Sequence, residues 1–390
     1  MEPLTWGRIA ARLILQFWPV WAALAATFAL SRHQRRRLGL YGKLFDSPIA
    51  MTGFALVMFW VFTAIFAPQI MTHDPLSQLS GMKNALPGSV APDGSVYLLG
   101  GDNLARDVFS RMVAGAVIVV QIAPLATLFA FMVGITLGLP AGYFGGMLDT
   151  GLSFLANLVL AFPVILLFYL LVTPEVAASG LPQILGLVLF VFPLVFAVIL
   201  LNARLRVNPA QRSRVLAAVL AAGGWLYLSL VSSPGGRIDL LPAALDPIEL
   251  PGNILIVFVS VVFVNAPTVF RIVRGLVMDI KTRDYVAASQ TRGEGPWYIM
   301  LWEILPNARG PLIVDFCLRI GYTTILLGTL GFFGLGLAPE SPDWGSTINA
   351  GRRLLSVYAH PAVAPALALM SLVLGLNLLA DGLREISLRD

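Results

Sequence analysis

Charged residues are scarce in this chain of 390 residues. Asp, Glu, Lys and Arg make up 12% of it, whereas hydrophobic residues make up 57% and the mean hydropathy is +0.82. A water-soluble domain of this size needs far more charge to cover its surface, so the composition excludes that class. Repeated apolar runs near 20 residues have the length that a hydrocarbon core of about 30 Å requires. The predicted fold class is an all-α polytopic membrane protein.

Cysteine and histidine are also rare, which excludes two kinds of site. Cys317 is the single cysteine, so no internal disulfide can form, and its apolar run suggests a small buried side chain. His33, His73 and His360 are scattered over three loops without metal-ligand spacing. We therefore expect no metal, no cofactor and no catalytic cluster in this chain.

A phosphate-binding loop is missing as well. The nearest approximation is Gly275 to Thr282, where Ile280 stands in place of the second glycine that the pattern requires. We therefore expect that the chain does not hydrolyse ATP. The net charge of +5 does not indicate nucleic-acid binding, because most of the 26 basic residues fall in the loops expected on one side of a bilayer.

Six apolar runs predict the main membrane spans. They are Pro48–Ile70, Val117–Ala141, about Leu152–Val172, Asn253–Arg271, Pro311–Leu337 and Val363–Leu379. Pro163 is expected to kink the third. Basic residues mark the cytoplasmic intervals, so the C-terminus is expected inside the cell.

The N-terminal region, residues 1–47, is expected to be an extension that precedes a domain at 48–390. Its apolar run, Leu13–Leu30, contains Gln16 and Pro19 and is followed by an arginine-rich block. The run is either a marginal span or a helix lying at the membrane interface.

The region of about 173–252 holds two further apolar runs, Leu181–Leu201 and roughly Val215–Val231, separated by an arginine-rich interval. A hairpin that enters and leaves the bilayer does not change the orientation of later spans. We therefore predict an inserted two-helix hairpin here.

The polar interval Asp279–Asn307 lies between two predicted spans and carries several basic residues. Its pattern predicts two short helices joined at Gly293. Tyr285, Val286 and Ala288 fall on one side of the first helix. The second helix has an apolar stripe of Trp297, Ile299, Met300, Ile304 and Leu305. Such a piece must rest on the membrane, on the rest of the chain or on a partner.

The same interval resembles the cytoplasmic coupling loop of ABC-importer permeases. That pattern runs Glu-Ala-Ala, three residues, Gly and later Leu-Pro. Ala287-Ala288-Ser289 takes the first place and Gly293 the second. Ala287 departs from the usual Glu, which puts the strength of ATPase docking in doubt; Asp284 or Glu294 would have to compensate.

A second string, Leu98–Ala116, resembles the segment before the second span of dipeptide and oligopeptide permeases, with Gly101 in place of a Thr and Ala105 in place of a Gly. By spacing alone, it predicts an amphipathic helix whose charges stay in headgroups and water. Those charges are Asp102, Arg106, Asp107 and Arg111. Gly142–Asp149, expected to be a tight loop, and the stretch around Pro342 to Ser346 resemble the same family.

The resemblance implies the second permease subunit of a peptide/nickel-type ABC importer, with a type I transmembrane domain of six core spans. It implies partners: a homologous permease subunit, two cytoplasmic ATPases and an extracytoplasmic binding protein, in the bacterial inner membrane. It assigns the ATPase-coupling loop to 284–307. The residues concerned are Asp284, Tyr285, Ala287, Ala288, Gly293, Leu305 and Pro306. The substrate stays open between peptide, nickel chelate and oligosaccharide.

Asp315 and Arg319 are the outstanding charges within a predicted span. At positions i and i+4 they share one helix face and can pair. They either line the translocation path, lock this subunit to its partner, or form a purely structural pair. The alternative class, an ion-driven transporter or membrane scaffold without an ATPase, would be expected to carry ionisable groups in several spans.

Overall fold

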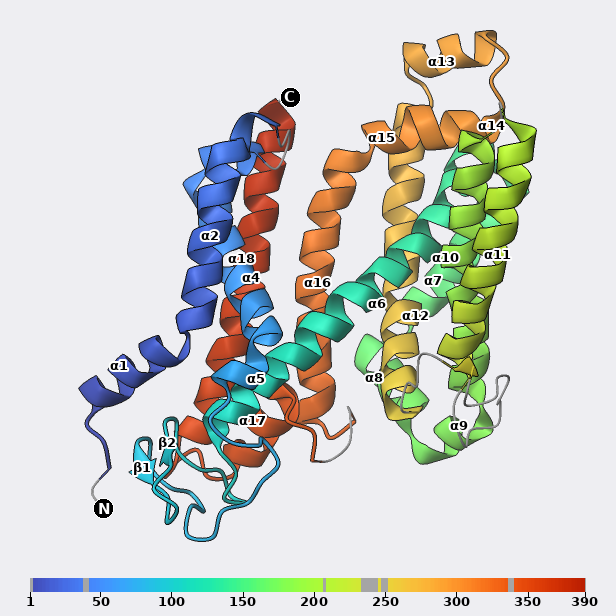
Figure 1. The fold of residues 1–390 in the computed structure, drawn as a ribbon. Coiled ribbons are helices and arrows are strands. Elements are labelled where there is room, and N and C mark those ends of the chain that lie inside the picture. The colour runs from blue at the N-terminus through green and yellow to red at the C-terminus, as the bar shows by residue number, and fades with distance from the viewer. Residues whose placement is uncertain are drawn as a thin grey trace. The chain divides into compact units, whose positions relative to one another are not determined.

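The computed structural model describes residues 3–37, 42–205, 208–232, 245–246, 252–335 and 340–389. The chain divides into two compact units, one made of residues 1–124 and 313–390 and the other of residues 125–312. Helices α6 and α16 each run from one unit into the other (Figure 1).

The first unit is mostly helical, with one small hairpin of strands inside the irregular segment 71–107. Its elements are α1 (Trp6–Gln16), α2 (Trp18–Gln34), α4 (Pro48–Ile65), α5 (Ala67–Ile70), β1 (Ser89–Val90), β2 (Val96–Tyr97), the start of α6 (Val108–Phe144), most of α16 (Arg309–Phe332), α17 (Trp344–Arg352) and α18 (His360–Arg389), with short 3-10 turns at Arg35–Arg37 and Leu44–Asp46. The strands pair antiparallel, with Val90 opposite Val96.

The second unit is built from helices throughout its described part. Its elements are the rest of α6, α7 (Gly146–Ala161), α8 (Val164–Val172), α9 (Pro174–Ser179), α10 (Leu181–Arg204), α11 (Pro209–Val231), α12 (Gly252–Ile280), α13 (Asp284–Thr291), α14 (Pro296–Tyr298), a π-helical turn at Ile299–Ile304 and α15 (Leu305–Asn307). Most of the loop between α11 and α12 lies outside the described residues.

Within the described ranges, seven helices are long and apolar enough to cross a membrane, and two bent helix pairs raise that number to nine if each pair is one span. The seven are Pro48–Ile65, Val108–Phe144, Leu181–Arg204, Pro209–Val231, Asn253–Ile280, Arg309–Phe332 and His360–Ile386. The all-α, multi-span class is therefore confirmed. Both runs of the predicted hairpin, α10 and α11, are helices of spanning length.

The bent pairs show where single runs break. The run Leu13–Leu30 is not one helix, because α1 and α2 meet at Phe17 with a bend of 54°. The third predicted span breaks at Phe162–Pro163 into α7 and α8, which are bent by 83°. Pro163 has no N–H to donate and restricts the residue before it to extended backbone, so the expected kink is a complete break.

Glycines let α6 and α12 approach closely in the second unit. A Cβ added at Gly134 would lie 2.5 Å from Val269 Cγ1, and one at Gly142 would lie 2.7 Å from Val277 Cβ. Gly138 lies between these two and would meet Val273 at 2.9 Å. A glycine every fourth residue thus faces a valine every fourth residue. Small residues allow this packing where lipid supplies no hydrophobic driving force.

Helices α4 and α18 pack closely in the first unit, where a Cβ on Gly53 would lie 2.3 Å from the backbone nitrogen of Leu379. Trp60, on α4, donates its indole N–H to Ser371 of α18 at 2.9 Å and stacks edge-to-face on Trp344. The aromatic pair lies in a cluster of buried residues that joins α4, α6, α17 and α18.

The predicted amphipathic helix through Asp102 and Arg106 is wrong. The helix begins only at Val108, and the preceding charged residues form a turn. Asp102 accepts hydrogen bonds from the backbone N–H groups of Leu104 and Arg106, at 2.8 and 2.9 Å, which closes that turn. Ala105 has φ +62°, a left-handed conformation that favours glycine and that the resembling family string fills with Gly.

The charges of this turn and of the first turn of α6 are buried and do not lie in headgroups or water. Asp102, Arg106, Asp107 and Arg111 are each at most 4% exposed. Arg106 Nε pairs with Asp102 Oδ2 at 2.7 Å. Asp107 accepts from the hydroxyl groups of Ser110 and Thr72, at 2.6 and 2.9 Å. Pairing and hydrogen bonding offset the cost of removing these charges from water.

Candidate functional site

The interval 284–307 forms a rigid helix-turn-helix in the second unit. As predicted, two helical stretches are joined at Gly293. Gly293 has φ +80°; its N–H bonds to Gln290 O, and the N–H of Glu294 bonds to Ser289 O, at 2.9 and 3.2 Å. These two bonds define a Schellman cap, which fixes the direction in which the chain leaves α13.

A polar clamp holds α13 against the second stretch. Ser289 Oγ donates to Glu303 Oε1 at 2.7 Å, and Arg292 Nη2 donates to both groups, at 2.7 and 3.2 Å. Val286, fully buried, adds an apolar contact point beside this clamp. The clamp was not predicted from the sequence, because no short-range pattern links Ser289 to a carboxylate fourteen residues later.

Most predicted coupling residues lie on the open side of this piece. Asp284, Tyr285, Ala287 and Ala288 are exposed on α13, whereas Leu305 is half-buried and Pro306 exposed on α15. The predicted grouping of Tyr285 and Ala288 with Val286 on one apolar side is wrong, since only Val286 is buried. In Figure 1, α13 stands clear of the ends of α10, α11 and α12 within its unit.

The predicted apolar stripe of the second stretch packs inward in large part. Ile299, Met300 and Ile304 are buried, while Trp297 is 40% exposed. The six residues from Ile299 to Ile304 are π-helical. Such segments are rare and occur frequently at functional sites. The piece therefore rests on its own chain and leaves the outer face of α13 free.

Polar contacts join both the coupling piece and the end of α12 to the region where α6 meets α7. Within the piece, Gln290 Nε2 donates to Tyr143 Oη at 3.3 Å. Lys281 Nζ donates to Gly142 O at 2.8 Å, and Arg274 Nη2 donates to Asp149 Oδ2 at 2.6 Å. The predicted tight loop at 142–149 is a turn at Gly145 between two helices. The two basic residues thus hold the end of α12, the helix that leads into the coupling piece.

The first turns of α6 are joined to the start of α17 in the first unit. Arg111 Nη2 donates to Ser341 O at 2.9 Å and to Thr347 Oγ1 at 3.2 Å. Trp344 Nε1 donates to Met112 O at 2.8 Å. Two strings that resemble the same family, about 230 residues apart, therefore lie against each other. Burial raises the pKa of Asp343, the N-cap of α17, against the hydrogen bonds from Ser346 that lower it.

Asp315 and Arg319 form the predicted pair on α16. Arg319 Nε lies 2.9 Å from Asp315 Oδ2, and their side chains are 11% and 16% exposed. Their role, as a path lining, a subunit contact or a structural pair, stays a prediction.

We expect the double variant D315A/R319A to be milder than either single variant. Removing one partner of a buried pair leaves an uncompensated charge and costs about 3–5 kcal/mol. The amount of monodisperse chain recovered from membranes measures this effect, with uptake assayed in parallel. An intact double variant that fails in uptake would instead show that the pair acts in the pathway.

The fold defines a multi-pass helical membrane protein that presents one rigid, braced helix at an end of its second unit. A family model for the inner membrane component of binding-protein-dependent transport systems matches residues 134–389. The chain belongs to this family. It is an inner-membrane permease subunit of an ABC importer and is not itself catalytic. By family, such a component works with an ATPase and a binding protein.

Named relatives cover most of the chain. The dipeptide transport system permease protein DppC of Haemophilus influenzae is 27% identical over 336 residues, which are 86% of this chain and 88% of that protein. The glutathione transport system permease protein GsiD of Pectobacterium atrosepticum is 27% identical over 75% of this chain and 72% of that protein. A probable D,D-dipeptide transport system permease protein, DdpC, of Escherichia coli is 25% identical over 87% of both chains.

Proposed function

We propose that this chain forms half of the translocation pathway of a peptide importer. The named substrates of its relatives, dipeptides, glutathione and D,D-dipeptides, are all short peptides or peptide-like molecules, which supports this substrate class over nickel chelates or oligosaccharides. The other half is a homologous permease subunit. Two cytoplasmic ATPases supply energy, and an extracytoplasmic binding protein delivers the peptide.

In this proposal, the transmembrane domain is of type I, with six core spans and the α10–α11 hairpin as an insertion. The domain occupies 48–390 and follows an N-terminal extension. The C-terminus lies in the cytoplasm, as the distribution of basic residues favours. The pathway opens alternately to the two sides as the ATPases close and separate.

The observation that carries the coupling role is the rigid presentation of α13. A helix transmits a push only if it cannot swing on its support, and the Schellman cap and the Ser289–Glu303 clamp meet that condition. The exposed face then contacts an ATPase. Asp284 and Ala287, at i and i+3, lie on neighbouring positions of this face. Asp284 therefore offers a carboxylate close to the position where the family pattern has Glu.

A pull-down tests the proposal. The tagged chain is extracted from native membranes in mild detergent, and the eluate is analysed by mass spectrometry and an ATPase assay. We expect a second permease and ATP-hydrolysing subunits to co-elute, and excess short peptide, with the binding protein, to stimulate hydrolysis. A stable chain that elutes alone would contradict the assembly, and stimulation by a nickel chelate or an oligosaccharide would contradict the substrate class.

A further inference from the structure

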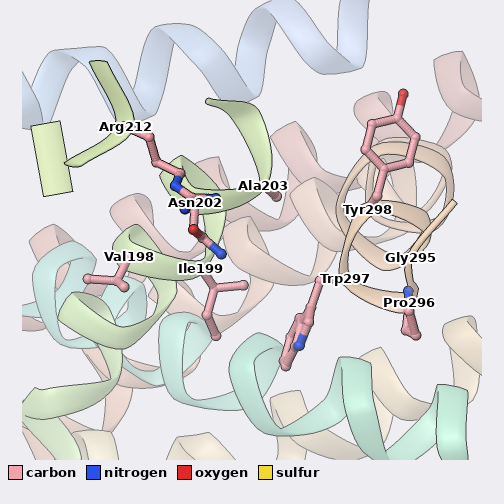
Figure 2. A pocket seen from close by; sticks show the side chains of 9 residues that line it. All are labelled: Val198, Ile199, Asn202, Ala203, Arg212, Gly295, Pro296, Trp297 and Tyr298. Carbon is pink, nitrogen blue, oxygen red and sulfur yellow. The ribbon is translucent and has the colours of Figure 1, made fainter. Parts of the chain in front are cut away.

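A pocket of about 300 Å³ lies between the predicted hairpin and the coupling piece, within the second unit (Figure 2). One wall comes from α10, the second from the start of α11 and the third from α14. The lining residues are Val198, Ile199, Asn202, Ala203, Arg212, Gly295, Pro296, Trp297 and Tyr298. The proposed coupling role does not involve the hairpin or this pocket.

The chemistry of the pocket is amphipathic. Val198, Ile199 and the indole of Trp297 supply apolar walls, and Arg212 and Asn202 supply polar groups. In Figure 2, Arg212 extends toward Asn202, while Trp297 enters from the other wall. The lining includes one cation and no carboxylate. Across the described residues, no hydrogen bond or ion pair of the Arg212 side chain is found, so no described group competes with a ligand for its donors.

The location of the pocket matches the headgroup level of a bilayer. It lies where α10 ends and α11 begins, and both helices are long and apolar enough to span. Trp and Tyr side chains are enriched at that level, with the apolar part of the ring toward the hydrocarbon. Arg204 and Arg214 stand at the same turn, so the local charge is positive.

We propose that this pocket binds the headgroup of an anionic phospholipid, with the Arg212 guanidinium on the phosphate and Asn202 on the glycerol side. Basic pockets between spanning helices bind such headgroups. A volume of about 300 Å³ is at the lower end of ligand pockets and holds a headgroup, whereas two acyl chains would remain in the bilayer. Val198 and Ile199 line the route of the first chain segment.

A lipid at this place would join the hairpin to the coupling piece. Its phosphate touches α11, and its glycerol region and first chain segment touch Trp297 at the start of the second coupling stretch. Occupancy would hold the two elements together and make ATPase coupling depend on the content of anionic lipid. This consequence rests on the proposed coupling role; binding itself does not.

Binding can be measured on the full-length chain in detergent with lipids that carry brominated acyl chains, which quench nearby tryptophan. The difference between the wild-type chain and W297F isolates Trp297 from the other seven tryptophans. We expect brominated phosphatidylglycerol to quench Trp297 at a concentration about fivefold lower than brominated phosphatidylcholine does, as one basic residue near the headgroup warrants. Equal quenching by the two lipids would overturn the proposal.

Arg214 provides the matched control, because it lies on the same helix, is exposed and is not part of the lining. We expect R212A to raise the half-quenching concentration of phosphatidylglycerol about fivefold, and R214A to change it less than twofold. An equal effect of both variants would show general surface attraction and overturn the site. Displacement of the lipid by millimolar inorganic phosphate would show a free-phosphate site and also overturn it.

The substitution Ala203→Leu tests the pocket without any change of charge, because the larger side chain fills the cavity from α10. We expect loss of the phosphatidylglycerol-specific quenching with an unchanged elution profile. Undiminished quenching in this variant would place the lipid elsewhere and refute the site. None of these measurements needs an ATPase or transport, so the lipid site and the importer assignment can fail separately.

Discussion

Replacing Gly293 by valine should reduce uptake at least tenfold while the chain still folds and assembles. A Cβ added at Gly293 would meet no atom within 4 Å, so the substitution fits sterically in the surroundings. The backbone is what resists it, because φ is +80° and a residue with a Cβ pays roughly 1–2 kcal/mol there, with β-branched residues the least tolerant. The cap can relieve this strain only by unwinding.

Unwinding the cap would release α13 from its support. Unwinding breaks the bond from Glu294 N–H to Ser289 O. Because Ser289 also donates its hydroxyl to Glu303, the same movement disturbs the clamp. A coupling helix that swings freely transmits no movement from the ATPase. The deficit should therefore appear in uptake and in substrate-stimulated hydrolysis, and not in the yield of the complex.

Two further variants separate backbone strain from side-chain size. Asn tolerates the left-handed conformation, so G293N should retain most uptake although its side chain is larger. Gly275 also meets no atom within 4 Å, but it lies in helical backbone, so G275V controls for the same change nearby. Full uptake by G293V, or equal loss in G293V and G293N, would refute a role for the cap geometry.

Local patterns in the sequence predicted the features that local physics determines. Hydropathy located α4, α10, α11 and α12 to within several residues at most ends, because a span must satisfy its backbone internally and present apolar side chains to lipid. The turn at Gly293 and the break at Pro163 follow from the conformational limits of glycine and proline. The pairing of Asp315 with Arg319 follows from helical spacing alone.

Contacts between segments far apart in the chain could not be predicted from local sequence patterns. Helical spacing of the charges from Asp102 onward suggested an exposed helix, but the partners of Arg111 lie at Ser341 and Thr347. These partners offset the cost of burying the charges. The Asp102 carboxylate then hydrogen-bonds the backbone of a turn, which competes with helix formation. The close packing of Gly134, Gly138 and Gly142 on three valines was likewise not predicted, because those valines lie more than 130 residues later in the chain.

Loss of Arg111 should have the largest effect on folding. Its side chain is 1% exposed and donates to the carbonyls of Pro75, Glu340 and Ser341 and to the hydroxyl of Thr347, at 2.9–3.4 Å. The planar guanidinium group, with its fixed donors, reaches acceptors on two separate segments at once, a geometry that a lysine ammonium group does not reproduce. Arg111 thus joins the start of α6 to the segment after α5 and to the start of α17.

We expect R111M to lower the stability of the chain by about 3–5 kcal/mol, because methionine matches the length of arginine but leaves the buried acceptors without donors. The stability of R111K should lie between those of the wild-type chain and R111M, since lysine keeps the positive charge but lacks the planar guanidinium group. The matched control is R353M, at an exposed arginine of the same unit, which should change stability by less than about 0.5 kcal/mol.

The fraction of detergent-purified chain that stays monodisperse after heating measures these differences. If R111M and R353M lose monodispersity at the same temperature, the hydrogen bonds of Arg111 add little beyond those that water would provide. The contact between the start of α6 and the start of α17 would then depend on Trp344 instead. Trp344→Phe then becomes the deciding variant, because it removes the bond to Met112 O and keeps most of the ring in the cluster with Trp60. We expect W344F to be the milder of the two changes, because it removes one neutral hydrogen bond worth about 1 kcal/mol and part of one buried ring, whereas R111M leaves several buried acceptors unpaired.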